Sequence, residues 1–291
     1  NTGPGFDGIN NYLLKSVITQ VVEPLVYIFN LSLTSGQVPN DMTLAKVIPI
    51  FKKGDSLLLS NHRPISLLTV LSKVLEKIYK ATIDFLNKIN TLSKEQFGFG
   101  EKHSTTHALL TFIDKIACPI DSSRHTIGIF LDLSKAFDTI NHNILLHKLS
   151  HYGIRGKALG WFRNYLTNRK QYVYINGTSS SKQPISCGVP QGSLLGPILF
   201  LIYINDIQNS STILQFILFA DDSNIFYSHS NPIELVAKVN QKLAHVTDWI
   251  KANKLSLNLK KTNYMVYSNT SSSIQHLFPK FQHTCRSITV D

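Results

Sequence analysis

The sequence predicts an α+β fold in which an antiparallel sheet packs against helices. Apolar residues recur at helical spacing in several long stretches, among them residues 10–33 and 232–253. Short runs rich in aromatic and β-branched residues separate them, and Leu214–Tyr227 has the pattern of a β-hairpin with Asp221 and Asp222 at its tip. The chain has 291 residues, of which 43% are hydrophobic and 16% charged. This composition is globular, and the length suffices for one large domain or two smaller ones.

After the first helix, a β-rich run at Ala45–Asp55 carries basic residues at both ends and a Lys-Gly-Asp turn. We expect a hairpin here that points three lysines outward: Lys46, Lys52 and Lys53. Such a hairpin could bind phosphates. A solvated edge strand, in which Lys and Pro deter aggregation, explains the same residues equally well.

Two helices are predicted in the next stretch. Asn61–Ser66 is expected to be a turn that starts a long amphipathic helix ending near Ile89. Ser104 is expected to cap a second helix that ends at Ala117. The Gly-rich segment Gln96–Gly100 is predicted to be the loop between them.

The middle of the chain alternates strands and helices. Thr126–Leu133 is predicted to be a strand buried on both faces. Asp138 is expected to cap the next helix, a contribution of about 1 kcal/mol. After a helix at Gly153–Asn168, two short strands are expected around 171–175 and 181–187, joined by the strong hairpin signal Asn176-Gly177.

The C-terminal part begins with the loop Gly188–Ser193 and an apolar helix that ends near Asn205-Asp206. The longest uncharged apolar run is Leu194–Ile204, and it is shorter than the roughly 20 residues that span a bilayer. It is therefore predicted to be a core helix, and no membrane partner is expected. A helix at 232–253 precedes a loop and strand at Leu255–Tyr267.

Charge and cysteine content bound the function and the compartment. The net charge of +11 favours a polyanionic partner, although a basic excess alone can also serve solubility. The three cysteines, Cys118, Cys187 and Cys285, have neither the paired spacing of a zinc site nor the even number of a disulfide framework, so reduced intracellular thiols are expected. The chain starts at Asn1 without a signal peptide, which favours a piece of a longer product.

Three carboxylates are the candidate chemical centre. Asp132 ends one predicted strand, and Asp221 and Asp222 lie in the turn between two others. If these strands are neighbours in one antiparallel sheet, the carboxylates converge at one edge. Oxygen ligands suit Mg²⁺, and two such ions about 4 Å apart stabilise both oxygens of an in-line phosphoryl transfer. The chemistry predicted is that of a polymerase or a nuclease, whereas an isolated Phe-Ala-Asp-Asp would more simply be an exposed turn.

Four segments resemble, in order, the successive motifs of reverse transcriptases. Their residues are similar to those of non-LTR (LINE-type, jockey-like) retrotransposons. They are FLDLSKAFD (130–138), GVPQGS (188–193), FADD (219–222) and LNLKKT (257–262). Upstream matches are GFDGI (5–9), IPIFKKGD (48–55), RPISLL (63–68) and QFGF (96–99). The resemblance spans residues 5 to about 268, and the order and spacing of the motifs make it specific.

The resemblance implies a right-hand polymerase fold without a thumb. Residues 1–125 are expected to be mainly fingers and residues 126–268 mainly palm, with a helical insertion at about 140–190 and an irregular tail at 269–291. Two Mg²⁺ ions, or Mn²⁺ in their place, are expected as cofactors. The implied metal ligands are Asp132, Leu133, Asp221 and Asp222.

The same resemblance implies contacts to nucleotide and nucleic acid. Phe137 would exclude a ribose 2′-hydroxyl, although any single Phe is more often a core residue. Gln191 would line the templating base pair in a loop where Gly188 and Gly192 allow close backbone approach, yet a tight turn before a helix explains these glycines as well. The remaining implied contacts are Lys52 and Arg63 to the nucleotide, and Lys53, Pro190 and Gly192 to nucleic acid.

The resemblance also implies a general acid for pyrophosphate release at Lys261, with Lys260 as the neighbouring candidate, although a surface lysine explains either residue as well. The family usually has an arginine where this chain has Gly100, which removes a phosphate or template contact that Lys102 and His103 compensate only in part. Residues 274–291 also lack the turn of a primer grip, so the chain looks like a truncated copy.

The function expected is an RNA-directed DNA polymerase that uses an RNA template, a DNA primer and dNTPs. The alternative is a catalytically silent remnant that binds nucleic acid by charge alone. A two-metal nuclease is a third interpretation, but it does not account for Gly188–Ser193 or Phe137. The expected location is intracellular, in the nucleus or the cytoplasm, within a ribonucleoprotein of the element.

Overall fold

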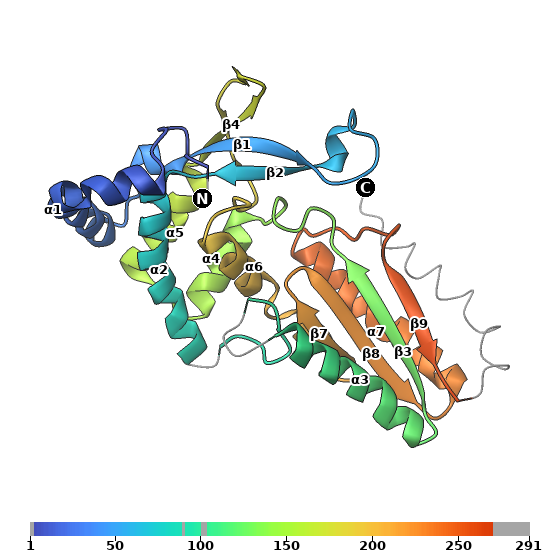
Figure 1. Cartoon of the computed structure of the whole chain (residues 1–291). Coiled ribbons are helices and arrows are strands. Elements are labelled where there is room, and N and C mark those ends of the chain that lie inside the picture. Colours follow the sequence, from blue (N-terminus) through green and yellow to red (C-terminus); the bar gives the residue numbers. More distant parts are fainter. Residues whose placement is uncertain (1–2, 89–90, 100–103, 270–291) are drawn as a thin grey trace. The chain divides into compact units, whose positions relative to one another are not determined.

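The computed structural model describes residues 3–88, 91–99 and 104–269 (Figure 1). The chain divides into two compact units. The first unit comprises Asn1–Thr91 and Ile140–Ile202, and the second comprises Leu92–Thr139 and Tyr203–Asp291. Both contain helices and strands, so the α+β prediction is confirmed. The predictions that concern residues 100–103, Cys285 and the tail 274–291 lie outside the described residues.

The first unit contains a five-stranded sheet in the order β2-β1-β4-β5, with β6 also paired to β4. The pairs β1–β2 and β4–β5 are antiparallel, whereas β1 and β4 are parallel. The strands are β1 (Leu44–Phe51), β2 (His62–Leu67), β4 (Lys170–Ile175), β5 (Thr178–Ser179) and β6 (Gln183–Pro184).

Two predictions about this sheet are corrected by the structure. Residues 62–67, expected within a turn that starts a helix, form β2 and pair with β1 over six residues. Pro64 tolerates this position because β2 is an edge strand, where a missing N–H is not needed by a neighbour. The strand expected at 181–187 is reduced to β6, because the Asn176-Gly177 turn already returns the chain as β5. That turn is confirmed, with φ of 48° and 85° at its two central residues.

The helices of the first unit are α1 (Asn11–Ser35), η1 (Asn40–Thr43), η2 (Leu59–Asn61), α2 (Val70–Lys88), α4 (His142–His151), α5 (Gly156–Thr167) and α6 (Leu195–Ile204), the last ending just past the unit boundary. The expected cap at Asp138 is wrong. Asn141 caps α4 by accepting a hydrogen bond from the Ile144 N–H at 3.1 Å, since the helix begins only at His142.

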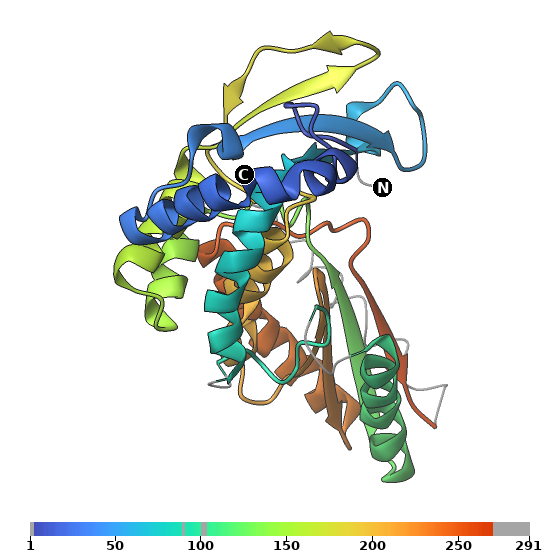
Figure 2. The same ribbon diagram turned by 60° about the vertical axis from the view of Figure 1, so that its left-hand side comes forward.

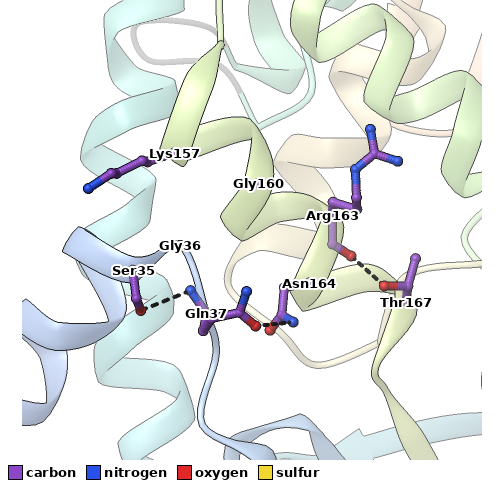
Figure 3. Close-up of a pocket in the computed structure, with 8 residues that line it drawn as sticks. All are labelled: Ser35, Gly36, Gln37, Lys157, Gly160, Arg163, Asn164 and Thr167. Carbon is purple, nitrogen blue, oxygen red and sulfur yellow. Dashed lines mark hydrogen bonds between the residues drawn. The ribbon is translucent and has the colours of Figure 1, made fainter.

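α1 is anchored to α5 at its C-terminal end. The indole N–H of Trp161 donates to Ser32 Oγ at 3.0 Å. Beyond Gly36, the Asn164 side chain accepts from the Val38 N–H at 2.8 Å and donates to Gln37 Oε1 at 2.7 Å. Figure 3 shows the open pocket of about 260 Å³ that this junction lines, with the hydrogen bond between Gln37 and Asn164 at its wall.

α1 is also the one helix in the described part of the chain that is long and apolar enough to cross a membrane, judged by length and composition only. Its 18-residue apolar window is 11% buried. The apolar run Leu194–Ile204, which was predicted to be too short for a membrane span, is uncharged, whereas α1 contains Lys15 and Glu23.

The second unit is a four-stranded antiparallel sheet in the order β7-β8-β3-β9. Its elements are α3 (Thr105–Asp121), β3 (His125–Asp132), η3 (Ile207–Ser210), β7 (Gln215–Phe219), β8 (Asp222–His229), α7 (Pro232–Ala252) and β9 (Asn263–Tyr267). Ser104 caps α3 as predicted, by accepting from the His107 N–H at 3.2 Å. The predicted hairpin is β7–β8.

The two long helices of this unit contact the sheet. Phe112 of α3 packs against Phe130 and Phe226, with ring centroids 6.1 and 5.2 Å apart. α7 contacts β8 and β3, and Figures 1 and 2 show it running along the sheet. Ile127, Ile129 and Leu131 of β3 are at most 5% exposed. The central strand is therefore held rigidly, and Asp132 is its last residue.

Candidate active site

Two carboxylates lie side by side at the end of the central ladder of the second unit. β3 pairs with β8 in antiparallel register, and Asp132 is the partner of Asp222. Paired residues of adjacent strands point to the same face, so both side chains share one face of the sheet. Asp221 precedes them in the two-residue turn between Phe219 and Asp222. The hairpin thus brings residues far apart in sequence to one sheet edge.

The motif after α7 closes over the same edge. Its backbone is tied to β3 by the Asn258 N–H, which donates to the Asp132 carbonyl at 2.7 Å, and by a bridge between Leu133 and Leu257. The Lys261 ammonium lies 3.4 Å from both carboxylate oxygens of Asp132. Both side chains are partly solvent-exposed, so this pair contributes little to stability and its ammonium can exchange partners.

An open cavity of about 560 Å³ lies over these groups. It is lined by Phe130, Leu131, Asp132, Phe219, Asp222, Asn224, Lys260, Lys261 and Asn263. Both candidate lysines, Lys260 and Lys261, border the cavity. Lys261 is the one whose ammonium contacts the Asp132 carboxylate. A charged ligand could therefore reach both carboxylates and an ammonium at once.

The electrostatics of the carboxylates are unfavourable without a cation. Loss of hydration, and then the charges of Asp221 and Asp132, raise the pKa of Asp222 above its usual value. The Lys261 ammonium opposes this rise. A divalent cation would relieve the same repulsion.

The donor set fits Mg²⁺, which binds one or two carboxylates and completes its octahedron with water and phosphate oxygens. Within residues 3–88, 91–99 and 104–269, no three His, Cys, Asp or Glu side chains are grouped closely enough to hold a metal by themselves. Asp132 and Asp222 supply a pair, and Asp221 is adjacent in sequence. Leu133, the fourth expected ligand, is 7% exposed.

The turn that carries Asp221 is supported by Gln96, a residue not predicted to belong to the site. Gln96 is buried, and its Oε1 accepts hydrogen bonds from the Ala220 N–H at 3.1 Å and from the Gly98 N–H at 2.8 Å. The Phe97 N–H donates to the Leu218 carbonyl at 2.8 Å, so the segment runs along β7. The sequence places Gln96 in the motif QFGF but gives it no role, because its partner Ala220 is 124 residues away.

The loop that carries Gln191 lies in the first unit and is fixed to β2. The Ser66 N–H donates to the Gln191 carbonyl at 2.7 Å. Gly192 has φ of 123°, and a Cβ there would lie 2.5 Å from the Ser66 carbonyl oxygen. Gly192 is therefore packed against the Ser66 backbone, and Pro190 is buried in the same loop.

Two buried polar side chains hold the ends of this loop. His142 Nε2 lies 2.8 Å from the Gly188 carbonyl. Glu76 Oε2 accepts from the Leu194 N–H at 2.6 Å, and Glu76 Oε1 accepts from the Tyr165 hydroxyl at 2.7 Å. Neither His142 nor Glu76 was identified from the sequence, because the periodicity of a helix does not reveal which long-range partners it meets.

The other predicted site residues are divided between the units. Lys52, Lys53 and Arg63 are exposed on β2 and on the β1–β2 connection of the first unit. Phe137 is half-buried in the turn after β3 in the second unit.

Comparison with known proteins identifies the family. The model of the family described as "Reverse transcriptase (RNA-dependent DNA polymerase)" matches residues 50–286, so the chain belongs to this family. The RNA-directed DNA polymerase from mobile element jockey of Drosophila melanogaster is 26% identical over 93% of this chain. The probable RNA-directed DNA polymerase from transposon X-element of the same species is 27% identical over 92% of it. The chain spans 30% of the length of each.

Solved structures with the same fold are telomerases from Candida Tropicalis. The apo enzyme aligns with a TM-score of 0.59 and 13% identity over 87% of this chain and 50% of that one. The telomerase bound to a TWJ fragment of telomeric RNA aligns with a TM-score of 0.57 and 14% identity over 87% and 46%. The predicted right-hand polymerase fold and the predicted non-LTR relationship are both confirmed.

Proposed function

We propose that this chain acts as the RNA-directed DNA polymerase domain of a non-LTR mobile element and extends a DNA primer with dNTPs on an RNA template. The observation that carries the proposal is the pairing of Asp132 with Asp222 under an open cavity, in a chain of the reverse transcriptase family. The relatives are about three times longer than this chain. Their names therefore describe longer proteins, and the activity of this chain alone is a proposal.

In this proposal two divalent cations are held by the carboxylates of Asp132, Asp221 and Asp222. Leu133 contributes through its backbone carbonyl oxygen, because its side chain has no donor atom. Bound Mg²⁺, or Mn²⁺, would supply charge stabilisation for the attacking 3′-oxygen and for the leaving pyrophosphate. Asp132 is kept in register by the hydrogen bond between its carbonyl and Asn258. Lys261, already 3.4 Å from Asp132, is suited to give a proton or positive charge to the leaving group.

The remaining roles concern recognition. In the first unit, Lys52 and Arg63 would bind the triphosphate, and the exposure of these two basic side chains supports this. Gln191 would line the templating base pair.

Further contacts to nucleic acid are assigned to Lys53, Pro190 and Gly192. Phe137 would reject ribonucleotides, because a flat ring against the sugar leaves no room for a 2′-hydroxyl. On the same proposal, residues 1–125 are mainly fingers and residues 126–268 mainly palm.

Because the proposed template is RNA, we place the protein inside the cell in this proposal. The proposed location is the nucleus or the cytoplasm, in a ribonucleoprotein of the element. A basic chain with charge +11 suits this assembly.

Primer extension tests the proposal. The substrate is poly(rA)/oligo(dT) with dTTP and Mg²⁺, and the variants are Asp221→Asn and Asp248→Asn, an exposed carboxylate on α7 that serves as the matched control. We expect extension by the wild type and the control, and none by Asp221→Asn, whose melting temperature stays unchanged. Absence of extension by the wild type, with the template still bound, would instead identify a silent remnant that only binds nucleic acid.

A further inference from the structure

Charge is segregated between the two sheets. The strands of the first unit's sheet, all of them within the described residues, contain Lys46, Arg63 and Lys170 but neither Asp nor Glu. The strands of the second unit's sheet contain Asp132 and Asp222 but neither Lys nor Arg. A polyanion is therefore attracted to the first sheet independently of the carboxylate site.

Strand register places the three cations on one face. Side chains alternate along a strand, so the even-numbered residues of β1, including Lys46, share a face. β4 aligns Tyr172 with Lys46, which puts Lys170 on the same face. In β2, Arg63 pairs with Ile50 and joins them. Figure 2 shows the blue β1 and the yellow-green β4 that form this surface.

On β1 and β2 the opposite face of the sheet is the buried one, whereas on β4 that face is open, with Val173 38% and Ile175 48% exposed. Ala45 is 0% exposed and Val47 is 4% exposed on β1, and Ser66 of β2 is 6% exposed. Arg63 and Lys170 are exposed, and Lys46 is half-buried. On β1 and β2 the cationic face is therefore the outer one, and on β4 the exposed Lys170 continues it.

Two tyrosines lie on the same face. Tyr172 and Tyr174 are two residues apart on β4, so their rings follow one another at about 7 Å along the strand. Both are half-buried, and partial burial, with Tyr174 as a further cause, raises the pKa of Tyr172. The Lys46 ammonium lies over the Tyr174 ring, 3.8 Å from its centroid, so it covers one face of that ring.

We propose that this outer face is a binding platform for single-stranded nucleic acid, the RNA template in particular, with bases stacked on Tyr172 and Tyr174 and phosphates bound by Lys46 and Lys170. Aromatic rings displayed on a sheet stack unpaired bases in this way, and neighbouring cations follow the backbone. A duplex hides its bases from such rings. The identity of the strand as template rests on the proposed function, whereas binding itself does not.

The test measures binding without catalysis. A fluorescein-labelled oligo(U) RNA of about 12 nucleotides, enough for one binding surface, is titrated with the full chain in EDTA and followed by anisotropy. The variants are Tyr172→Leu and Tyr174→Leu, with Tyr172→Phe and Tyr174→Phe as ring-preserving partners. Tyr27→Leu, 70% exposed on α1 of the same unit, is the matched control.

Each Leu variant is expected to bind about tenfold more weakly or worse, whereas the Phe variants and Tyr27→Leu bind as the wild type does. Lys170→Gln should reduce the slope of log affinity against log salt by about 0.7, and Lys15→Gln on α1 should leave it unchanged. Oligo(dT) binding with the same dependence on Tyr172 and Tyr174 supports the stacking surface, because stacking does not require a 2′-hydroxyl.

Leu variants that melt as the wild type does and still bind oligo(U) with unchanged affinity would overturn the platform. So would Phe variants as weak as the Leu variants, or a preference for duplex over single strand. Asp221→Asn should bind oligo(U) normally, so failure of the carboxylate site and failure of the platform are distinguished.

Discussion

Asp132 of β3 and Asp222 of β8 are direct partners in an antiparallel ladder, so two carboxylates of like charge face one another. Like charges in this position destabilise a sheet. The metal-free fold therefore carries a repulsion that Lys261 relieves in part and that a bound cation would relieve further.

Replacing Asp222 by Asn should separate stability from activity. In EDTA, the free energy of unfolding should rise by roughly 0.2–1 kcal/mol, because one like-charge pair is lost. Primer extension with Mg²⁺ should fall by about a hundredfold or more, because a cation ligand is lost. Urea denaturation and extension rates measure the two effects, and Asp248→Asn should change neither. A variant that is less stable in EDTA would contradict the repulsion.

Gln96 should matter for catalysis through the turn that it supports. Gln96→Met keeps the size of the side chain but leaves the buried N–H groups of Ala220 and Gly98 without their acceptor. The expected cost is about 1–3 kcal/mol in the free energy of unfolding. Because Ala220 already has a positive φ of 55°, the turn should relax and displace Asp221.

The test of this role compares the effects of Gln96→Met on kcat and on KM. Gln96→Met should lower kcat, while KM for the primer–template should stay within a factor of about two, because no binding residue is removed. Gln241→Met, on the exposed side of α7, is the control and should behave as the wild type. Normal kcat in a destabilised Gln96→Met would show that the glutamine is structural only.

Two glycines of the first unit should respond in opposite directions to alanine. Gly192→Ala would bring a Cβ against the Ser66 carbonyl at a φ of 123°, so it should destabilise the protein by about 1–3 kcal/mol. Gly160 lies inside α5 in the wall of the pocket in Figure 3, with nothing within 4 Å of its Cβ position. Gly160→Ala should stabilise by about 0.4–1 kcal/mol. Thermal melts of both variants decide this, and equal shifts would contradict it.

Much of the fold followed from local signals. The Asn176-Gly177 turn, the Ser104 cap and the β7–β8 hairpin each depend on residues that are neighbours in the chain, so pattern and propensity suffice. β2 was missed because Pro64 and a short length disguise a strand whose pairing partner, β1, supplies its stability.

The sequence predicted the carboxylates of the site but not the residues that support them. Carboxylates at a strand end and a hairpin tip identify Asp132, Asp221 and Asp222 as candidates without any contact map. Gln96 and Glu76 could not be found this way, because their partners Ala220 and Tyr165 are 124 and 89 residues distant. Such supports are set by tertiary packing, which the sequence pattern does not encode.

Glu76 should give the first unit a distinctive pH dependence. Burial raises the pKa of its carboxyl above the usual value of 4.5, although the hydrogen bond from Tyr165 and the Arg169 guanidinium lower it in part. Between 4.5 and the raised value, the folded chain holds a proton that the unfolded chain has released. The contribution of Glu76 to the free energy of unfolding therefore falls as pH rises through this window.

Glu76→Gln removes the titration and retains one acceptor for the Tyr165 hydroxyl. The difference in unfolding free energy between wild type and Glu76→Gln, measured in urea at increasing pH from about 4, should thus shift in favour of the variant as pH rises above 4.5. Glu23→Gln, exposed on α1, controls for the loss of one carboxylate and should show no such trend. A difference that is constant, or that moves toward the wild type, would mean that Glu76 is ionised throughout and that Arg169 dominates its environment.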